Sequence, residues 1–152
     1  MDEQMVKRVE RFLKGHVYCT LATCSNSTPL STVVVYVSDG LDLYFFTGVD
    51  TKKLRDVKEN PSVSVAVAGR RFLFFPQAVE MQGKAEVLSG KEADDARRLY
   101  FSRKRPEFRA AKKVAKMSEI RWIRVRPTHI FTYGIGTKPW QLDPKKQFKR
   151  IL

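Results

Sequence analysis

The sequence predicts a mainly β protein in which six to seven antiparallel strands form one barrel, flanked by α-helices. Most of the chain consists of short runs that alternate apolar and polar residues and end at turn residues, a pattern typical of half-buried strands. Only one strand–helix–strand unit is visible, which argues against a doubly wound parallel sheet. With 152 residues, 43% of them hydrophobic, the chain has the size of one domain, and we expect a single domain over residues 1–152.

The N-terminal half predicts one helix and three strands. Residues 1–15 carry apolar side chains at helical spacing, from Met5 to Leu13, which indicates an amphipathic helix. The alternating segments HVYCTLAT and LSTVVVYV form a hairpin across the polar turn CSNSTP, and a turn at Ser38, Asp39 and Gly40 precedes the next strand. The predicted strands lie at 16–23, 30–37 and 41–47.

The remaining chain predicts three helices and four strands. Asn60-Pro61 ends a short helix, because a residue that precedes proline avoids helical backbone, and Pro127 separates the last two strands. This helix starts after Asp50 or Thr51, the other predicted helices lie near 90–101 and 106–116, and the predicted strands lie at 62–69, 78–88, 119–127 and 128–135. The basic segment 143–152 is a candidate for a mobile tail.

The formal charge of +13 is concentrated near the C-terminus. Residues 103–152 hold fifteen Lys or Arg and three acids, a net charge of +12. Such a field attracts polyanions, so nucleic acid, anionic lipid and multiply phosphorylated or polyglutamylated small molecules are all candidate partners. The charge does not choose among them, and binding of nucleic acid is not favoured. The basic helix Arg103–Lys116 is also what a solvated surface helix looks like.

Several functional classes find no support in the residues. Cys19 and Cys24 are too few for a structural zinc site, and we expect no metal and two reduced thiols. No apolar run approaches the roughly 20 residues of a membrane helix, and the first residues lack a secretory signal. We therefore expect a cytoplasmic protein without a membrane partner. His16 and His129 are expected to be structural, and no catalytic residue is assigned.

The segment YFFTGVDTKKLRDVKENP, residues 44–61, is the most informative part of the chain. A strand ends at Thr47, Asp50 or Thr51 can cap the following helix, and Lys52 and Lys53 fall in its first turn. A helix start presents unpaired N–H groups and partial positive charge, so a phosphate there gains from the amides and from both ammonium groups. A solvated, charged connecting helix has the same pattern, and the spacing alone does not decide between them.

The chain also resembles a known family. The succession CTLAT, PLSTVVVYV, DGLDLYFFTG, TKKLRDVKENPSVSVAV and QGKAEV is similar to the FMN-binding split β-barrel family related to pyridoxamine 5′-phosphate oxidase, over roughly residues 5–135. The most specific part is the hydroxyl-ended strand, the basic pair, the short helix and the Asn-Pro that opens a Val-rich strand. The resemblance implies a split β-barrel homodimer with FMN at the subunit interface. It also implies a flavin-dependent oxidoreductase that acts on a small molecule not identified by the sequence.

The resemblance implies where the phosphate and the ribityl chain of FMN bind. Lys52 and Lys53 would hold the phosphate with help from Thr47 and Thr51, and Arg55 is a reserve candidate. Phe46 would pack near the ribityl chain or the ring.

The same comparison implies which residues lie beside the flavin ring. Backbone groups of Ser31, Thr32 and Val33 would hydrogen-bond the ring edge. Gln77 would replace a glutamine of the family, provided that the register shifts by one residue. Trp140, in the turn-rich segment YGIGTKPWQ, would lie over the flavin of the partner subunit.

Three departures from the family restrict the expected activity. Ser31 stands where the vitamer oxidases carry an arginine, and Tyr36 stands where they carry a lysine. The C-terminal signature of those enzymes, which contains arginine and histidine, is also missing. We therefore do not expect oxidation of pyridoxamine phosphate itself.

Three functions remain open from the sequence. The first is an FMN enzyme. The second is a reductase of the same fold that binds a deazaflavin, whose acidic tail would meet the basic C-terminal third. The third is a flavin-carrying or nucleic-acid-associated protein without turnover.

Overall fold

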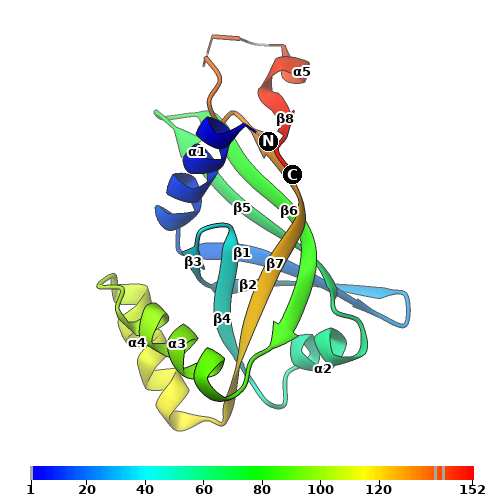
Figure 1. The fold of residues 1–152 in the computed structure, drawn as a ribbon, viewed down its shortest axis with the longest axis vertical. Helices are drawn as coiled ribbons and strands as arrows, with labels where there is room; N and C mark the ends of the chain where they lie inside the picture. The colour runs from blue at the N-terminus through cyan, green and yellow to red at the C-terminus, as the bar shows by residue number, and fades with distance from the viewer. Residues whose placement is uncertain (1, 139, 142) are drawn as a thin grey trace.

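The computed structural model describes residues 2–138, 140–141 and 143–152. Within them, eight strands form one antiparallel sheet, accompanied by five helices (Figure 1). The elements are α1 (Glu3–Lys14), β1 (Tyr18–Ser25), β2 (Thr28–Val35), β3 (Val37–Asp39), β4 (Asp42–Gly48), α2 (Lys52–Glu59), β5 (Ser62–Arg71), β6 (Phe75–Val87), α3 (Gly90–Phe101), α4 (Pro106–Met117), β7 (Ile120–Tyr133), α5 (Pro144–Gln147) and β8 (Phe148–Arg150). The prediction of a mainly β, antiparallel fold with flanking helices is confirmed.

The sheet curls, and the two strands at its opposite edges, β2 and β3, are consecutive in the chain and joined by Tyr36. Its strand order is β2-β1-β5-β6-β7-β4-β3, with β8 beside β7, and one residue separates the terminal strands β2 and β3. Tyr36 is fully buried; its N–H donates to Val17 O at 2.9 Å and its hydroxyl to Leu13 O at 2.7 Å. The prediction of one strand over 30–37 is wrong here, because the chain leaves β1 and joins β4 within these residues.

The predicted hairpin between β1 and β2 is confirmed, but its turn is shorter than expected. The strands pair from Tyr18–Val35 to Ser25–Thr28, and only Asn26 and Ser27 connect them. Both connecting residues have positive φ, 50° and 60°, which suits a two-residue turn that follows the twist of the strands. Figure 1 shows this hairpin crossing β4, β6 and β7.

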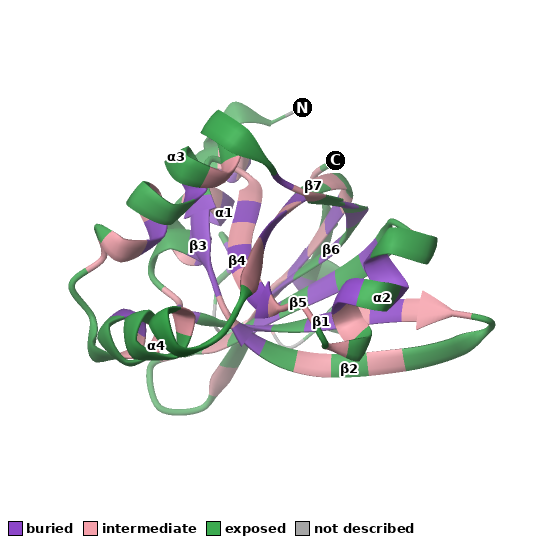
Figure 2. Ribbon diagram, turned by 90° about the horizontal axis from the view of Figure 1, so that it is seen from below, coloured by how far each residue is buried: buried purple, intermediate pink, exposed green. Residues whose placement is uncertain are grey.

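Alternation along the strands builds two apolar clusters. The larger one fills the barrel and includes α1 through Met5, Val9 and Leu13. The smaller one lies under α3 and α4 and is rich in aromatic side chains, among them Tyr100 and Trp122. β4 serves both clusters, since Phe45 faces the first and Phe46 the second. Figure 2 shows the alternation of buried and exposed residues along the strands.

The last two predicted strands are one long strand, β7. A register shift lies between Gln82 and Gly83 of β6, opposite Pro127, so the proline is accommodated at a bulge and does not end the strand. Thr128 falls in the bulge, and its hydroxyl donates to Gln82 O at 3.1 Å. A Cβ atom at Gly83 would lie 2.4 Å from Arg126 O, so the close approach of the two backbones requires glycine there.

The C-terminal segment 143–152, expected from the sequence to be a mobile tail, contains the short elements α5 and β8. β8 pairs with β7 from Phe131–Arg150 to Tyr133–Phe148, and Ile151 N–H donates to Ile130 O at 2.8 Å. Separation of β3 from β2 and the addition of β8 raise the strand count above the predicted six to seven. Among the described residues, no helix is long and apolar enough to cross a membrane.

Candidate functional site

The start of α2 offers hydrogen-bond donors that no side chain of the described residues caps. Thr51 is the N-cap residue, and Asp50 lies outside the helix. The Thr51 hydroxyl donates to Gly48 O at 2.9 Å and lies 2.8 Å from the hydroxyl of buried Thr47, so it does not reach the first amides of the helix. The first amides of α2 can therefore donate to an anion that binds at the helix start, just after the end of β4.

Lys52 is held by a buried carboxylate. Its Nζ atom donates to Asp56 Oδ1 at 2.8 Å and to Oδ2 at 3.0 Å. Thr23 of β1 donates to Asp56 Oδ2 at 2.9 Å, so the same carboxylate ties α2 to the sheet. The hydrogen bond from Lys52 lowers the pKa of the Asp56 carboxyl below its ordinary value of 3.8. The charge of Lys52 is thus largely balanced within the chain.

The charge of Lys53, unlike that of Lys52, is not balanced by an acid of the described residues. Its side chain is half-buried, and it makes no ion pair with an acid among the residues that the structure describes. Burial lowers the pKa of the Lys53 ammonium from its ordinary value of 10.5, because the charged form loses hydration. Arg55, the reserve candidate, is exposed and donates to Asp50 O at 3.0 Å. Lys53 is therefore the cation at this helix start that most needs an anion.

The strand with Ser31, Thr32 and Val33 lies at the edge of the sheet. β2 pairs with β1 on one side, and its other edge has no strand partner in the described parts of the chain. Ser31 and Val33 are exposed, Val33 to 65%, whereas Thr32 is half-buried and lies opposite Leu21. Figure 2 shows α2 beside β1 and β2. The backbone groups that were predicted to meet the flavin ring are thus on an edge strand whose only strand neighbour in the described residues, β1, also contacts α2.

The side chain of Phe46 does not lie on the same face of β4 as that of Thr47. Neighbouring residues of a strand point to opposite faces, and the Phe46 ring lies in the aromatic cluster, 5.5 Å from the Tyr100 ring and 5.3 Å from the Trp122 ring between centroids. The hydroxyl of Tyr100 donates to Val35 O at 3.1 Å, which fixes this cluster to β2. Within one chain, the surroundings of Phe46 are therefore those of a packing residue.

Figure 1 shows the start of β6 and the elements α5 and β8 at the end of the barrel opposite α2. Gln77 belongs to the first of these segments, and Trp140 precedes α5 in the chain. Gln77 is near the start of β6, and its side-chain amide donates to Gly134 O at 3.0 Å, whereas the helix start lies near the end of β6. Trp140 is 71% exposed, with Lys138 Nζ 5.8 Å from its ring centroid. One chain does not bring these two side chains together with Lys52 and Lys53.

Sequence reasoning missed Asp56 and Thr23. The spacing of Lys52 and Asp56, four residues apart on a helix, is a readable signal for an ion pair. That the carboxylate is buried and bonded to a threonine 33 residues away depends on how α2 packs on β1.

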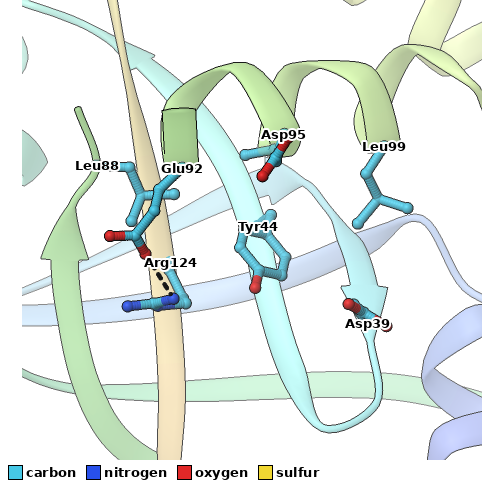
Figure 3. A pocket seen from close by; sticks show the side chains of 8 residues that line it. Asp39, Tyr44, Leu88, Glu92, Asp95, Leu99 and Arg124 are labelled. Atoms are coloured by element: carbon cyan, nitrogen blue, oxygen red, sulfur yellow. Dashed lines mark ion pairs between the residues drawn. The ribbon is translucent and has the colours of Figure 1, made fainter. Parts of the chain in front are cut away.

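A cavity of about 290 Å³ lies elsewhere, between α3, β3, β4 and β7 (Figure 3). Asp39, Tyr44 and Glu92 line it together with Arg124, which pairs with Glu92 at 3.0 Å and with Glu86 at 2.6 Å. None of the predicted site residues lines this cavity. The described residues also contain no group of three His, Cys, Asp or Glu side chains that could hold a metal ion.

The curled antiparallel sheet and the basic helix start after β4 define a class, the split β-barrel proteins with the FMN-binding fold. Within that class, the chain belongs to the pyridoxamine 5′-phosphate oxidase family, whose sequence model matches residues 5–134. The resemblance stated from the sequence is confirmed.

Curated relatives and solved structures agree with this placement. The chain is 30% identical over 96 residues to General stress protein 26 of Bacillus subtilis, which covers 62% of this chain and 69% of that protein. It is 31% identical over 99 residues to a pyridoxine/pyridoxamine 5′-phosphate oxidase of Ehrlichia ruminantium, covering 64% of this chain and about half, 48%, of that protein. A heme-binding protein from Mycobacterium smegmatis has the same fold, with a TM-score of 0.78 at 17% identity over 97% of this chain and 57% of that one.

Proposed function

We propose that this protein is a homodimeric oxidoreductase that binds FMN and acts on a small molecule. The observation that carries the proposal is the start of α2, where Thr51 lies beside Thr47, no side chain caps the first amides, and the half-buried Lys53 in the first turn has no ion pair with an acid among the described residues. A phosphate dianion supplies the negative charge and the acceptors that this arrangement lacks.

The residues at the helix start fit the phosphate of FMN in chemical type, since uncapped amides and two ammonium groups are donors that a phosphate dianion accepts from. Lys53 and the first amides of α2 would hold the phosphate, with the Thr51 hydroxyl beside them and Lys52 sharing its charge with Asp56. The open edge of β2 would fix the ring through backbone groups of Ser31 to Val33. When bound, FMN supplies hydride and electron transfer, and the protein binds it, orients it and shields it.

A second subunit would complete the site. Gln77 near the start of β6 and Trp140 before α5 belong to the end of the barrel that Figure 1 shows opposite α2, so they would meet a flavin on Lys52 and Lys53 from a partner subunit. A twofold contact would bring each end of one barrel to the opposite end of its partner, and such isologous contacts are the commonest assembly. Trp140 was predicted to lie over the flavin of the partner subunit, and we now propose the same partner contribution for Gln77.

The structure supports a substrate other than pyridoxamine phosphate. Tyr36, at the position where the vitamer oxidases carry a lysine, is fully buried and bonded to Leu13 O, so it cannot bind a phosphate. Ser31, where they carry an arginine, is exposed but neutral. The substrate is therefore proposed only as a small molecule that reaches the flavin at the subunit interface, and the cytoplasm remains the expected compartment.

The absorbance spectrum of the purified protein, followed by titration of the stripped protein with FMN, tests this function. Bands of oxidised flavin and saturable binding of FMN are the expected result. Binding of a deazaflavin without binding of FMN would assign the reductase instead. Binding of heme alone would contradict any flavin function, and salt-sensitive binding to DNA without any cofactor would assign a nucleic-acid partner.

A further inference from the structure

A groove runs along β3, between α1 and the connection from α3 to α4. Its larger part has a volume of about 590 Å³ beside the β3–β4 turn, and a smaller part of about 210 Å³ shares Lys14, Ser38 and Arg103 with it. Figure 1 shows α1, α3 and α4 on the side of the molecule away from α2 and the tip of the β1–β2 hairpin. None of the lining residues belongs to α2, β2, β6 or the C-terminal segment, so the residues proposed for the flavin site, in either subunit, are not those of the groove.

Basic side chains line both walls of the groove. Three of them come from α1 at positions i, i+4 and i+7, which share one face of the helix and form a row about 10 Å long. Three more lie in the connection after α3. In the part of the chain that the structure describes, one of the six forms an ion pair, Arg105 with Glu107 at 3.5 Å. The six basic residues are Lys7, Arg11 and Lys14 on α1 and Arg103, Lys104 and Arg105 after α3.

Arg103 is held against the backbone of β3. Its side chain is half-buried, and one terminal nitrogen donates to Ser38 O at 3.3 Å. A guanidinium has five N–H donors and stays charged, and no acid of the described residues pairs with this one. Arg103 is therefore a positioned cation whose remaining donors can bind an anion in the groove.

Two acids also line the groove, and both lie at its end beside the β3–β4 turn. Asp39 also lines the cavity of Figure 3, and Glu10 Oε1 is 3.7 Å from the position of a Cβ atom at Gly40. The smaller part of the groove, toward Arg103 and Arg105, has no acid in its lining. The excess of positive charge is therefore greatest between the end of α1 and the connection after α3.

We propose that this groove binds the phosphate chain of an oligophosphate, either free or carried by a nucleotide. An oligophosphate has several linked negative charges, so it contacts cations on both walls at once, which a single phosphate does not. Arginine side chains pair with phosphate oxygens through two parallel hydrogen bonds. A cleft lined mostly by one sign of charge also concentrates ions of the opposite sign.

The lining of the groove favours a small oligophosphate over a nucleic-acid strand. Proteins that bind single strands stack the bases on exposed aromatic side chains. Among the residues of the groove, Tyr36 and Phe108 are buried, and the His16 ring lies against the Phe12 ring, with 4.1 Å between centroids. The groove therefore offers cations for phosphates but no aromatic surface for bases.

Calorimetric titration of the full chain, with FMN present in excess, tests the proposal. Inorganic triphosphate and ATP should each bind to one site, and AMP and orthophosphate should bind at least about tenfold more weakly, because they place fewer charges between the walls. Added salt should weaken the binding of triphosphate. ATP that binds more tightly than triphosphate would identify the ligand as a nucleotide, and equal affinities would identify the phosphate chain alone.

Substitutions on the two walls locate the binding site. Arg11→Gln and Arg103→Gln should each lower the affinity for triphosphate about tenfold or more, the loss expected for one hydrogen bond between charged groups. Arg11 is exposed, so its replacement tests the groove even if that of Arg103 disturbs the fold. Two controls should change the affinity little: Arg109→Gln removes an exposed charge of α4 outside the groove, and Lys53→Ala alters the start of α2.

Four results would overturn the proposal. The first is an absence of saturable binding of triphosphate. The second is an equal loss of affinity in Arg109→Gln and in both groove variants, which would mean that triphosphate responds only to net charge. The third is a loss in Lys53→Ala alone, which would place triphosphate at the start of α2. The last is a deoxythymidine oligomer that binds more tightly than ATP and depends on Arg11 and Arg103, which would make the ligand a nucleic acid.

Discussion

The Nζ atom of Lys52 lies 2.8 Å from Oδ1 of Asp56, so one of the two lysines at the start of α2 is already paired with a buried carboxylate. Lys53, its neighbour, is half-buried without such a pair among the described residues. Two adjacent lysines that look equivalent in the sequence therefore differ in how much charge each can offer to a phosphate.

This difference predicts unequal effects of their replacement. Lys53→Ala should weaken FMN binding by about 1.5–3 kcal/mol, the range for a hydrogen bond to a charged group, and Lys52→Ala should weaken it less. Quenching of FMN fluorescence during titration measures both. Lys58→Ala, an exposed lysine in the last turn of the same helix, is the control and should have no effect. Equal losses for all three variants would mean that only the net charge of the helix matters.

The lowered pKa of Asp56 predicts how stability depends on pH. Its carboxylate is stabilised in the folded protein, so its contribution is present above the unfolded pKa of about 3.8 and is lost as the pH falls through the lower folded pKa. Asp56→Asn should lower Tm at neutral pH, and its Tm should then fall less than that of the unchanged protein below pH about 4. Thermal melts at several pH values test this, with exposed Asp94→Asn as the control. Parallel curves for Asp56→Asn and the unchanged protein would refute the role of this carboxylate.

The lowered pKa of Lys53 predicts how FMN binding depends on pH. Burial makes this ammonium lose its proton at a lower pH than a free lysine, and a bound phosphate should raise its pKa again. FMN affinity should therefore be highest while Lys53 is protonated in the free protein, and it should fall as the pH rises through that lowered pKa. Titrations between pH about 7 and 10.5 measure the decline, which Lys53→Ala should abolish. A decline of the same size in that variant would assign it to another group.

The bulge at Gly83 predicts a local cost of a single methyl group. A Cβ atom there would lie 2.4 Å from Arg126 O, so Gly83→Ala must push β6 and β7 apart and should destabilise the fold by about 1–3 kcal/mol. Gly15→Ala is the control, because the nearest atom to a Cβ atom there is 3.4 Å away and its φ is negative. Urea denaturation measures the free energy of unfolding of both variants. An equal stability of the two would show that the backbones of β6 and β7 can separate freely.

The sequence predicted most of the elements because their signals are local. Alternation located β1, β4 and β5, and Asn60-Pro61 marked the end of α2 where the structure has it. The predicted strand break at Pro127 was wrong, because the bulge that accommodates this proline depends on Gly83 of the neighbouring strand. β8 was not predicted, because it is defined by its pairing with β7, which no pattern within residues 143–152 reveals.

The residues of the candidate site were predictable from the sequence to a similar extent. The hydroxyl-ended strand and the basic pair gave Thr47, Thr51, Lys52 and Lys53, which the structure brings together at one helix start. The pairing of Lys52 with a buried acid and the separation of Gln77 from α2 follow from packing across the barrel, so they required coordinates.

A parallel titration with FMN and riboflavin, which differ only in the phosphate, tests the central claim most directly. The protein should bind FMN more tightly than riboflavin, and changing Lys52 and Lys53 together to Ala should remove that preference while leaving riboflavin binding almost unchanged. A double variant that still prefers FMN to the same degree would contradict the assignment of the phosphate site to the start of α2.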